Sequence, residues 1–597
     1  MKLRRTAIAE TFADETAALS AGVAQSLPPG VAALRQAAPA ADSKVPAAGC
    51  LWRPASSGGF AAAAESSATA LPAAIATIAG DAIERARQLR DDGGLYDADG
   101  RLSHGAEQAL AATGLFGLAV PGEHGGSGCG MQQLCRVVSA LARVSPTSSG
   151  MLSVHSTIGA VWALRDFGSS DQQQRHLPRL ARGEALSIFA ATEPDAGCDL
   201  GRVATTLTRH DGRLLLTGHK LFITGATHGR LVKVLARDAD NEGVPVVLLA
   251  QLPAHDTEQV RLERCPLHPL KHAHNQAILF NDFEIDPADI LTPPTKPGRD
   301  PDAMQIVWHG LNRGRITLAA QAVGTLSLML SEAIAYARSR ETWGQPIASR
   351  ELIQGRIGRI AAAAVACEAL TSWAAHTIDA GGRGELEAIV AKVAASGLMR
   401  DAAADAYGIH GGRGFLLGHP LGDSLHDLFA VNTYEGESGL LELALFKGLA
   451  KQHPLAARRR ESKIALLGPL LALTLSRRSA AAEDRAILDA RFRSFARAAR
   501  RGLTHSARDI ERAMRHHGRN LADRQLVVGH LATRVRELLT VLAVAHHADR
   551  VLAPQGNATV LAAAETCCRL TLARATGRHP SARDLACLAE TGRRVLG

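Results

Sequence analysis

Residues 432–436 read Asn-Thr-Tyr-Glu-Gly, and an apolar run at 440–449 with helical spacing follows them. This stretch puts one carboxylate, that of Glu435, between an aromatic residue and a glycine. In an apolar pocket a carboxylate has a raised pKa, which makes it a better proton acceptor. Glu435 is therefore the candidate catalytic base. The alternative is a glutamate that only stabilises the start of the next helix through the helix dipole.

Three more segments stand before this stretch: FAATEPDAGCDL at 189–200, GHKLFITGA at 218–226 and RETWG at 340–344. In that order and spacing, the four segments resemble the acyl-CoA dehydrogenase family, flavoenzymes that desaturate acyl thioesters. The resemblance extends from about residue 115 to residue 451. It implies an FAD cofactor. It also implies a fold of an N-terminal helical domain, an antiparallel β domain and a C-terminal four-helix bundle.

Hydrophobic periodicity agrees with this architecture. Helical patterns dominate before residue 189, short Val-, Leu-, Thr- and Ile-rich segments such as 213–217 follow, and helical patterns return after 300. We therefore predict a mainly α protein with a small β domain. The predicted domains are an N-terminal extension and linker, an N-terminal helical domain, a β domain, a helical bundle domain and an additional C-terminal helical domain, at 1–70, 71–188, 189–290, 300–452 and 455–597.

Both ends of the chain lie outside the three expected domains. Residues 38–70 are rich in Ala, Ser, Pro and Gly without clear periodicity, and we interpret them as a mobile linker. Residues 455–597 resemble the extra helical domain of the very-long-chain branch of the family, which implies long acyl chains and a homodimer. The apolar stretch 465–475, within the arginine-flanked segment 458–478, fits either a peripheral membrane contact or a helix buried between domains.

The composition bears on whether the protein is soluble, binds nucleic acid, binds metal or spans a membrane. Apolar residues make up 46% and charged residues 21% of the chain, as in ordinary soluble proteins. The net charge of +9 permits nucleic-acid binding, but the arginines are spread along the chain, so a solvated helical surface is preferred. Nine cysteines without a CxxC pair or metal-ligand spacing predict a reducing compartment and no metal site. No apolar run reaches the ~18 residues of a membrane span. We expect a cytoplasmic protein, peripheral at the membrane; a mitochondrial location is the alternative.

The resemblance implies which residues bind FAD. Thr192 runs beside the flavin ring, and Phe222 and Thr224 lie on its other flank. Arg340 begins a motif by which one subunit holds the adenine-side half of the FAD of its neighbour, and a glycine pair lets the pyrophosphate approach bare backbone. The implied cofactor-binding residues are Phe189, Ala191, Thr192, Cys198, Phe222, Thr224, Arg340, Thr342, Trp343, Gly408, Gly411, Gly412 and Glu437.

The resemblance also implies a substrate site. Its residues are Cys198, Asn312, Arg315, Tyr434 and Gly436. Two of them depart from the family pattern. Cys198 replaces a serine near the phosphates and donates hydrogen bonds more weakly. Asn312 replaces an aspartate, which removes a charge beside Arg315.

Three cofactor positions also depart from the family pattern. Phe222 replaces a tryptophan and loses an indole donor, and Gly408 replaces a glutamine and loses a side-chain contact. Glu437 stands where the family has threonine. A carboxylate at this position would either raise the pKa of Glu435 by repulsion or, if turned toward the cofactor, oppose the FAD phosphates.

Removal of an α-proton and a β-hydride from an acyl thioester needs a base, a dry pocket and a hydride acceptor. We expect FAD-dependent dehydrogenation of long-chain acyl-CoA to trans-2-enoyl-CoA in fatty acid β-oxidation. Glu435 would take the α-proton, flavin N5 the β-hydride, and an acceptor like electron-transfer flavoprotein would reoxidise the flavin. The first alternative is a dehydrogenase of acyl chains on a carrier protein in secondary metabolism. The second is a flavin-containing nucleic-acid-binding protein.

Overall fold

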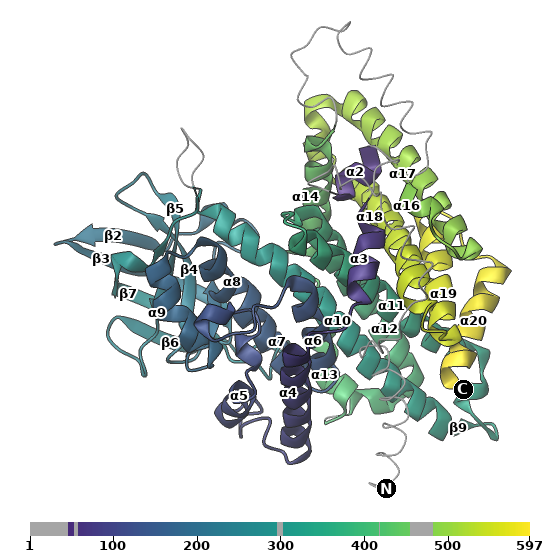
Figure 1. The fold of residues 1–597 in the computed structure, drawn as a ribbon, viewed down its shortest axis with the longest axis horizontal. Coiled ribbons are helices and arrows are strands. Elements are labelled where there is room, and N and C mark those ends of the chain that lie inside the picture. The colour runs from purple at the N-terminus through teal and green to yellow at the C-terminus, as the bar shows by residue number, and fades with distance from the viewer. Residues whose placement is uncertain (1–45, 53–57, 295–301, 417, 454–481) are drawn as a thin grey trace, which may run out of the picture. The chain divides into compact units, whose positions relative to one another are not determined.

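The computed structural model describes residues 46–52, 58–294, 302–416, 418–453 and 482–597. They divide into two compact units (Figure 1). The sheet unit is Leu71–Gly324. The bundle unit combines Thr325–Gly597 with the described part of Met1–Ala70.

Helices open the sheet unit, as the periodicity predicts. Capping side chains mark where they begin: Ser103 accepts a hydrogen bond from the backbone of Ala106, and Ser169 forms a capping box with Gln172. The helices are α4 (Ala73–Asp91), α5 (His104–Ala111), α6 (Met131–Ala142), α7 (Pro146–Ser153), α8 (Val161–Phe167) and α9 (Ser170–Ala181).

A twisted, mostly antiparallel sheet follows. Its strands pair in the order β6-β7-β3-β2-β4-β5-β8, and β1 pairs with β4 in parallel. The apolar side chains of β4 and of the segment 247–250 in β5 are buried, so these strands form the core of the sheet. The strands are β1 (Ser187–Ala190), β2 (Thr206–His210), β3 (Arg213–Thr224), β4 (Leu231–Asp238), β5 (Val244–Gln251), β6 (Val260–Arg264), β7 (Asn275–Ile285) and β8 (Ile290–Leu291).

The long helix α10 (Met304–Ser339) begins in the sheet unit and ends in the bundle unit. By length and composition it could cross a membrane, but 61% of its most apolar window is buried inside the protein. A helix that is apolar all round and buried is typical of a protein core.

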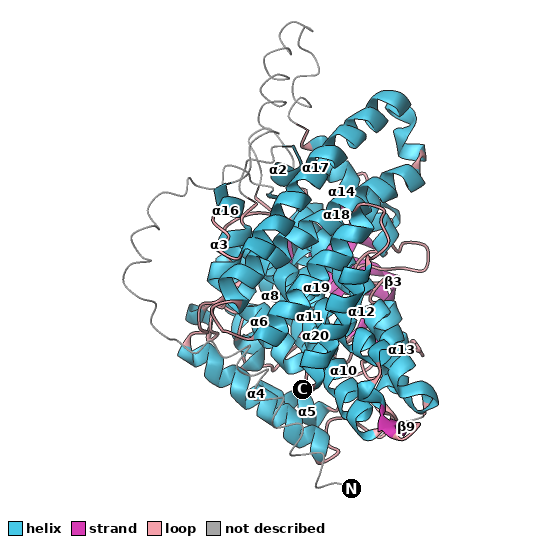
Figure 2. Cartoon of the chain, turned by 90° about the vertical axis from the view of Figure 1, so that its right-hand side faces the viewer, coloured by secondary structure: helices cyan, strands magenta, loops and turns pink. Residues whose placement is uncertain are grey.

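In its described part, the bundle unit is helical apart from one short hairpin. Helix α11 packs against α12, α19 and α20, and α18 packs against α17 and α19 (Figure 2). The elements are β9 (Glu341–Thr342), β10 (Gln345–Pro346), α11 (Glu351–Asp379), α12 (Glu385–His410), α13 (Pro420–Ala430), α14 (Ser438–Lys451), α16 (Ala482–Arg485), α17 (Ala490–His517), α18 (Gln525–His547), α19 (Ala558–Ala575) and α20 (Ala582–Leu596).

The predicted linker at 38–70 is wrong for the described part of that segment. Two helices, α2 (Pro46–Trp52) and α3 (Phe60–Ser67), lie within the bundle unit, purple among the green and yellow helices of Figure 1. The indole nitrogen of Trp52 donates to the carbonyl of Leu449 at 2.8 Å. Burial of aromatic side chains explains why this segment is helical and packed. The free energy gained by burying each ring is larger than the conformational entropy that a flexible linker would retain.

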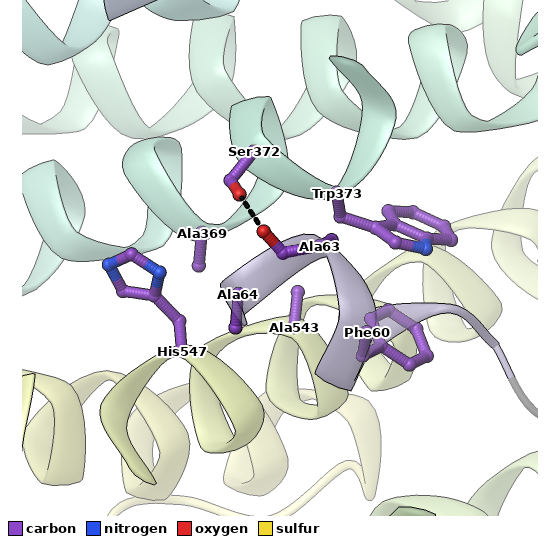
Figure 3. Close-up of a pocket in the computed structure, with 8 residues that line it drawn as sticks. All are labelled: Phe60, Ala63, Ala64, Ala369, Ser372, Trp373, Ala543 and His547. Atoms are coloured by element: carbon purple, nitrogen blue, oxygen red, sulfur yellow. Dashed lines mark hydrogen bonds between the residues drawn. The ribbon is translucent and has the colours of Figure 1, made fainter. Parts of the chain in front are cut away.

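Helix α3 is held tightly between α11 and α18. Figure 3 shows the pocket at this contact, in which the hydroxyl of Ser372 donates to the carbonyl of Ala63 at 3.1 Å. The ring of Phe60 stacks on Trp373 with centroids 4.8 Å apart. The pocket does not admit a water molecule. It is therefore a packing contact and not a ligand site.

Other predictions concern residues that the structure does not describe. The predicted membrane contact at 458–478 and the first 45 residues of the predicted N-terminal extension belong to segments that the structure does not describe. The five predicted domain ranges stay a prediction.

A buried carboxylate attaches α2 to α12. Glu387 is buried, and burial raises its pKa from 4.5 to about 7, although the backbone N–H of Ala47 donates to it at 2.8 Å. Because the folded pKa is raised, this group contributes stability at pH values below 4.5 that is lost as the pH rises through about 7.

We therefore predict that Glu387→Gln, which keeps an acceptor for Ala47, becomes more stable than the wild type as the pH rises. The gap should open between pH 4.5 and 7 and level off above that, at up to roughly 3 kcal/mol. Thermal unfolding across this pH range measures the gap. The exposed Glu385, replaced by Gln on the same helix, is the control, and parallel pH curves for wild type and Glu387→Gln would contradict the prediction.

Candidate functional site

The predicted site residues fall into two groups, one in each unit. Those of the sheet unit are Phe189, Ala191, Thr192, Cys198, Phe222, Thr224, Asn312 and Arg315. Those of the bundle unit are Arg340, Thr342, Trp343, Gly408, Gly411, Gly412, Tyr434, Glu435, Gly436 and Glu437.

In the sheet unit, the two segments predicted to flank the flavin lie side by side. The backbone N–H of Leu221 on β3 donates to the carbonyl of Thr192 at 2.9 Å. The amine of Lys220 donates to the carbonyl of Ala191 at 3.2 Å and to the carboxylate of Glu193 at 2.8 Å. The segment after β1 and the end of β3 are thus joined by backbone and side-chain bonds.

Glu193 and Lys220 form a buried ion pair. Burial lowers the pKa of Lys220 to about 8, against the attraction of Glu193. Burial opposes ionisation of Glu193, but hydrogen bonds from Lys220 and Thr205 hold its pKa below the usual value. The backbone N–H of Ala204 also donates to Glu193, at 2.6 Å. The pair therefore stays charged, which fixes the loop that follows β1.

Sequence reasoning missed this pair, although both residues lie inside the quoted motifs. The available signal was a charged residue within an apolar strand: Lys220 stands among Leu, Phe and Ile in GHKLFITGA. A buried lysine in such a strand needs an acceptor, and the acidic residue of the other motif provides one.

A bulge in β3 places the aromatic side chain predicted beside the flavin. The pairing of β3 with β7 shifts register between Lys220 and Ile223, and Phe222 within the bulge has φ +58°. Bulges re-aim side chains, and Phe222 is 51% exposed. The hydroxyl of Thr224 donates to Asn275 at 2.9 Å, which orients it at the end of the strand. Cys198 is exposed on the loop after β1.

The substrate-side pair on α10 is buried. Asn312 and Arg315 stand one helical turn apart, and the guanidinium of Arg315 donates to the amide oxygen of Asn312 at 3.4 Å. Asn312 therefore keeps an acceptor for the arginine while it removes the carboxylate charge.

In the bundle unit, the β9–β10 hairpin presents the residues predicted to reach a neighbouring subunit. Trp343 at its tip is 90% exposed and has φ +50°. Arg350 supports the hairpin, because its guanidinium donates to the carbonyl of Thr342 at 2.9 Å and lies 5.7 Å from the Trp343 ring. Arg340 is exposed at the base of the hairpin.

The glycines at the end of α12 lie in two different environments. A side chain on Gly408 would overlap the guanidinium of Arg356 from α11, so the arginine occupies the space that a glutamine would need. Side chains on Gly411 and Gly412 would meet nothing within 4 Å. The backbone of this glycine pair is open, as close approach of a pyrophosphate requires.

The base turn, residues 431–437, connects α13 to α14. Glu435 adopts φ +56°, a conformation that non-glycine residues rarely hold. Burial, with the charges of Glu435 and Asp427, raises the pKa of Tyr434 well above its ordinary value. The carboxylate of Glu437 accepts from the backbone N–H groups of Gly439 and Leu440, both at 2.9 Å. Glu437 is the N-cap of α14, so the helix-stabilising role considered for Glu435 belongs to Glu437.

A group of side chains resembling a metal site is a salt-bridge network. Glu483, Asp484 and His546 lie close enough together to hold an ion. The guanidinium of Arg500 donates to Asp484 at 2.7 Å and to Glu483 at 2.9 Å. The carboxylates therefore already have a cation, which ties α16 to α17.

Comparison with known proteins places this geometry in a family. Three family models match in order: acyl-CoA dehydrogenase N-terminal domain at 74–184, middle domain at 188–283 and C-terminal domain at 304–449. The chain is 32% identical to an acyl-CoA dehydrogenase of Bacillus subtilis over 57% of this chain and 88% of that protein. It is 29% identical to the acryloyl-CoA reductase (NADH) of Anaerotignum propionicum over 58% of this chain and 86% of that protein.

Solved structures share the fold. An acyl-CoA dehydrogenase of Bacillus anthracis complexed with FAD matches with a TM-score of 0.72 and 18% identity, over 88% of this chain and 95% of that one. The prolyl acyl carrier protein oxidase AnaB matches with a TM-score of 0.57 and 23% identity, over 64% of this chain and all of that one.

The chain therefore belongs to the acyl-CoA dehydrogenase family. It is an FAD-dependent oxidoreductase, with helical N- and C-terminal domains, a middle β domain and extra C-terminal helices, as the sequence predicted. Taken separately, each unit has residues that fit FAD: the backbone at Gly411 and Gly412 is open in the bundle unit, and Phe222 is exposed at its bulge in the sheet unit.

We predict that Lys220→Met destabilises the sheet unit, because it leaves the carboxylate of Glu193 buried without its cation. The loss should be on the order of 3 kcal/mol and should be partly recovered in the double variant Glu193→Gln/Lys220→Met. Thermal unfolding and retention of FAD on gel filtration measure both effects. Lys271→Met, at an exposed lysine of the same unit, is the control. Equal unfolding temperatures for Lys220→Met and Lys271→Met would show that the pair has no structural role.

Proposed function

We propose that this enzyme oxidises long-chain acyl-CoA to trans-2-enoyl-CoA, with Glu435 as the base that removes the α-proton. The observation that carries the proposal is the division of roles on the base turn. Glu437 caps α14, whereas Glu435 occupies a strained backbone conformation that serves no helix. Strain of about 1–3 kcal/mol per residue persists where the surrounding structure imposes it and is concentrated at functional sites.

Proton removal needs more than a carboxylate. The α-proton of a thioester becomes acidic only when its carbonyl is polarised, and a backbone N–H aimed at the oxygen supplies that polarisation. The N–H of Glu435 is our candidate donor. Its positive φ gives the peptide group before Glu435 a different orientation from the one it has in a regular turn. Burial and nearby carboxylates raise the pKa of Tyr434, so this side chain adds no charge beside the base. Bound FAD accepts the β-hydrogen as hydride.

Preference for long chains is supported by the extra helical region. The Bacillus anthracis structure covers 88% of this chain, whereas the AnaB structure covers 64%. The match to the Bacillus anthracis structure therefore extends beyond the part of the chain that the three family domains cover. The hairpin with Trp343, which is 90% exposed, supports a homodimer, because tryptophan is enriched at protein–protein interfaces. We further propose an acceptor like electron-transfer flavoprotein, a role in fatty acid β-oxidation and a cytoplasmic location with peripheral membrane association.

We predict that Glu435→Gln abolishes substrate-dependent flavin reduction, because an amide cannot accept the α-proton. The rate should fall by about a thousandfold or more, while FAD content is unchanged. Anaerobic addition of palmitoyl-CoA, followed by the visible flavin absorption, measures this rate. The exposed Glu351, replaced by Gln, is the control. Bleaching of Glu435→Gln at the wild-type rate would end the assignment of the base.

We predict that palmitoyl-CoA has a kcat/KM at least about tenfold above that of octanoyl-CoA, because each buried methylene contributes roughly 0.8 kcal/mol. Steady-state rates with an artificial electron acceptor measure the ratio. A flat profile from eight to sixteen carbons would show that the acyl chain is not bound along its length.

A second candidate is dehydrogenation of acyl chains tethered to a carrier protein. Exposed Cys198 and the uncharged Asn312 favour it, since both replace residues on the CoA side of the family site. Turnover of palmitoyl groups on CoA and on carrier protein, at equal concentrations, separates the two. Preference for the carrier-bound substrate would replace acyl-CoA in the proposed function, and equal or better turnover of CoA would exclude the alternative.

A further inference from the structure

A fully buried lysine contacts the base turn from a neighbouring helix. Lys392 lies in the middle of α12 and is 1% exposed. Its amine donates to the carbonyl of Gly436 at 2.7 Å, to the carbonyl of Asn432 at 3.3 Å and to the hydroxyl of Ser438 at 3.3 Å. These three partners stand on both sides of Glu435.

The position of Lys392 is costly unless its bonds are made. Removing an ammonium group from water costs several kcal/mol, which hydrogen bonds to well-placed acceptors must offset. A lysine amine has three donors in a compact tetrahedral arrangement, and a pair of carbonyls with a hydroxyl matches that arrangement. The contact therefore constrains both partners. The ammonium group needs the acceptors of the turn, and its three bonds fix the positions of those acceptors.

A second set of bonds closes the same turn. The backbone N–H of Ser438 donates to the carbonyl of Asn432 at 2.9 Å, and its hydroxyl lies 3.1 Å from that carbonyl. Ser396, one turn after Lys392 on α12, lies 3.3 Å from the same hydroxyl. Asn432 and Ser438 are thus joined to each other and to α12, with Glu435 between them in the chain.

We propose that Lys392 is a positioning residue: it holds the carbonyls of Asn432 and Gly436 so that Glu435 keeps its left-handed backbone conformation and faces the substrate. This inference rests on the proposed function, because it assigns the means by which the base is oriented. Lys392 acts through the backbone on either side of the base. Without it, the strained residue relaxes toward an ordinary turn, and both its carboxylate and its N–H lose their direction.

The test is Lys392→Met, which keeps the apolar stem and removes the donors. Exchange of the α-protons of palmitoyl-CoA with D2O, followed by mass spectrometry, reports on the base without hydride transfer. We expect the exchange rate and kcat to fall about a hundredfold, as for a misplacement of about 1 Å, with KM changed less than about threefold. Backbone amide exchange of the peptide covering 430–440 should become faster, while FAD content stays at the wild-type level.

Val390→Ala is the matched control. Val390 is buried on the same helix, so its truncation costs packing energy but removes no hydrogen-bonding group. We expect it to lower the unfolding temperature but to leave α-proton exchange near the wild-type rate. If Lys392→Met folds, binds FAD and exchanges α-protons as fast as Val390→Ala, the positioning role is overturned.

Ser438→Ala decides the matter if Lys392→Met does not fold. It removes one acceptor of the lysine and the bond to Ser396, so α-proton exchange should fall by about three- to tenfold, and a rate equal to that of Val390→Ala would overturn the proposal. Failure of the proposed function gives a different result: wild-type protein would show no α-proton exchange, or Glu435→Gln would exchange as fast as wild type. Loss in Glu435→Gln with no change in Lys392→Met would reject the positioning role alone.

Discussion

Each unit depends on a buried ammonium group that donates to backbone carbonyls. In the sheet unit, Lys220 bonds to Ala191 and to Leu235, and so joins β3 to the loop after β1 and to β4. In the bundle unit, Lys392 holds the carbonyls on either side of Glu435. A buried cation tolerates little movement of its acceptors, because each lost bond leaves an uncompensated charge. These bonds therefore restrict the movement of the loops that carry the proposed chemistry.

The family, the fold class and the cofactor could be predicted from short motifs, because their residues are close together in sequence. Strand bounds were harder. The segment 213–217 was expected to end before Gly218, yet β3 continues to Thr224. The pairing of β3 with β7 shifts register between Leu216 and Gly218. This bulge accommodates the glycine, so the strand continues past it. The helices at 46–52 and 60–67 were missed because each is short and half of their buried residues are alanine, which gives weak periodicity.

Two departures from the family pattern gain a physical account only in three dimensions. Gly408 removes a side chain, and the guanidinium of Arg356 from another helix lies over it. Glu437 adds a carboxylate beside the base, and the start of α14 accommodates it through two backbone N–H groups. The arginine over Gly408 could not be predicted from the neighbouring sequence, because it lies on another helix. Glu437 was recognisable as a helix cap by position, but its proximity to Glu435 favoured an electrostatic interpretation.

The burial of α2 and α3 in the bundle unit bears on how the chain folds during synthesis. These helices are synthesised before α17 and α18, against which they pack. At roughly 5–20 residues per second, more than 400 residues must be added before those partners exist, a delay of about 20–100 seconds. During that interval the sheet unit, which is continuous in the chain, can fold. Phe60 remains exposed until Trp373 of α11 is made, and Trp52 until Leu449 of α14 is made. Exposed apolar segments of this kind are bound by chaperones.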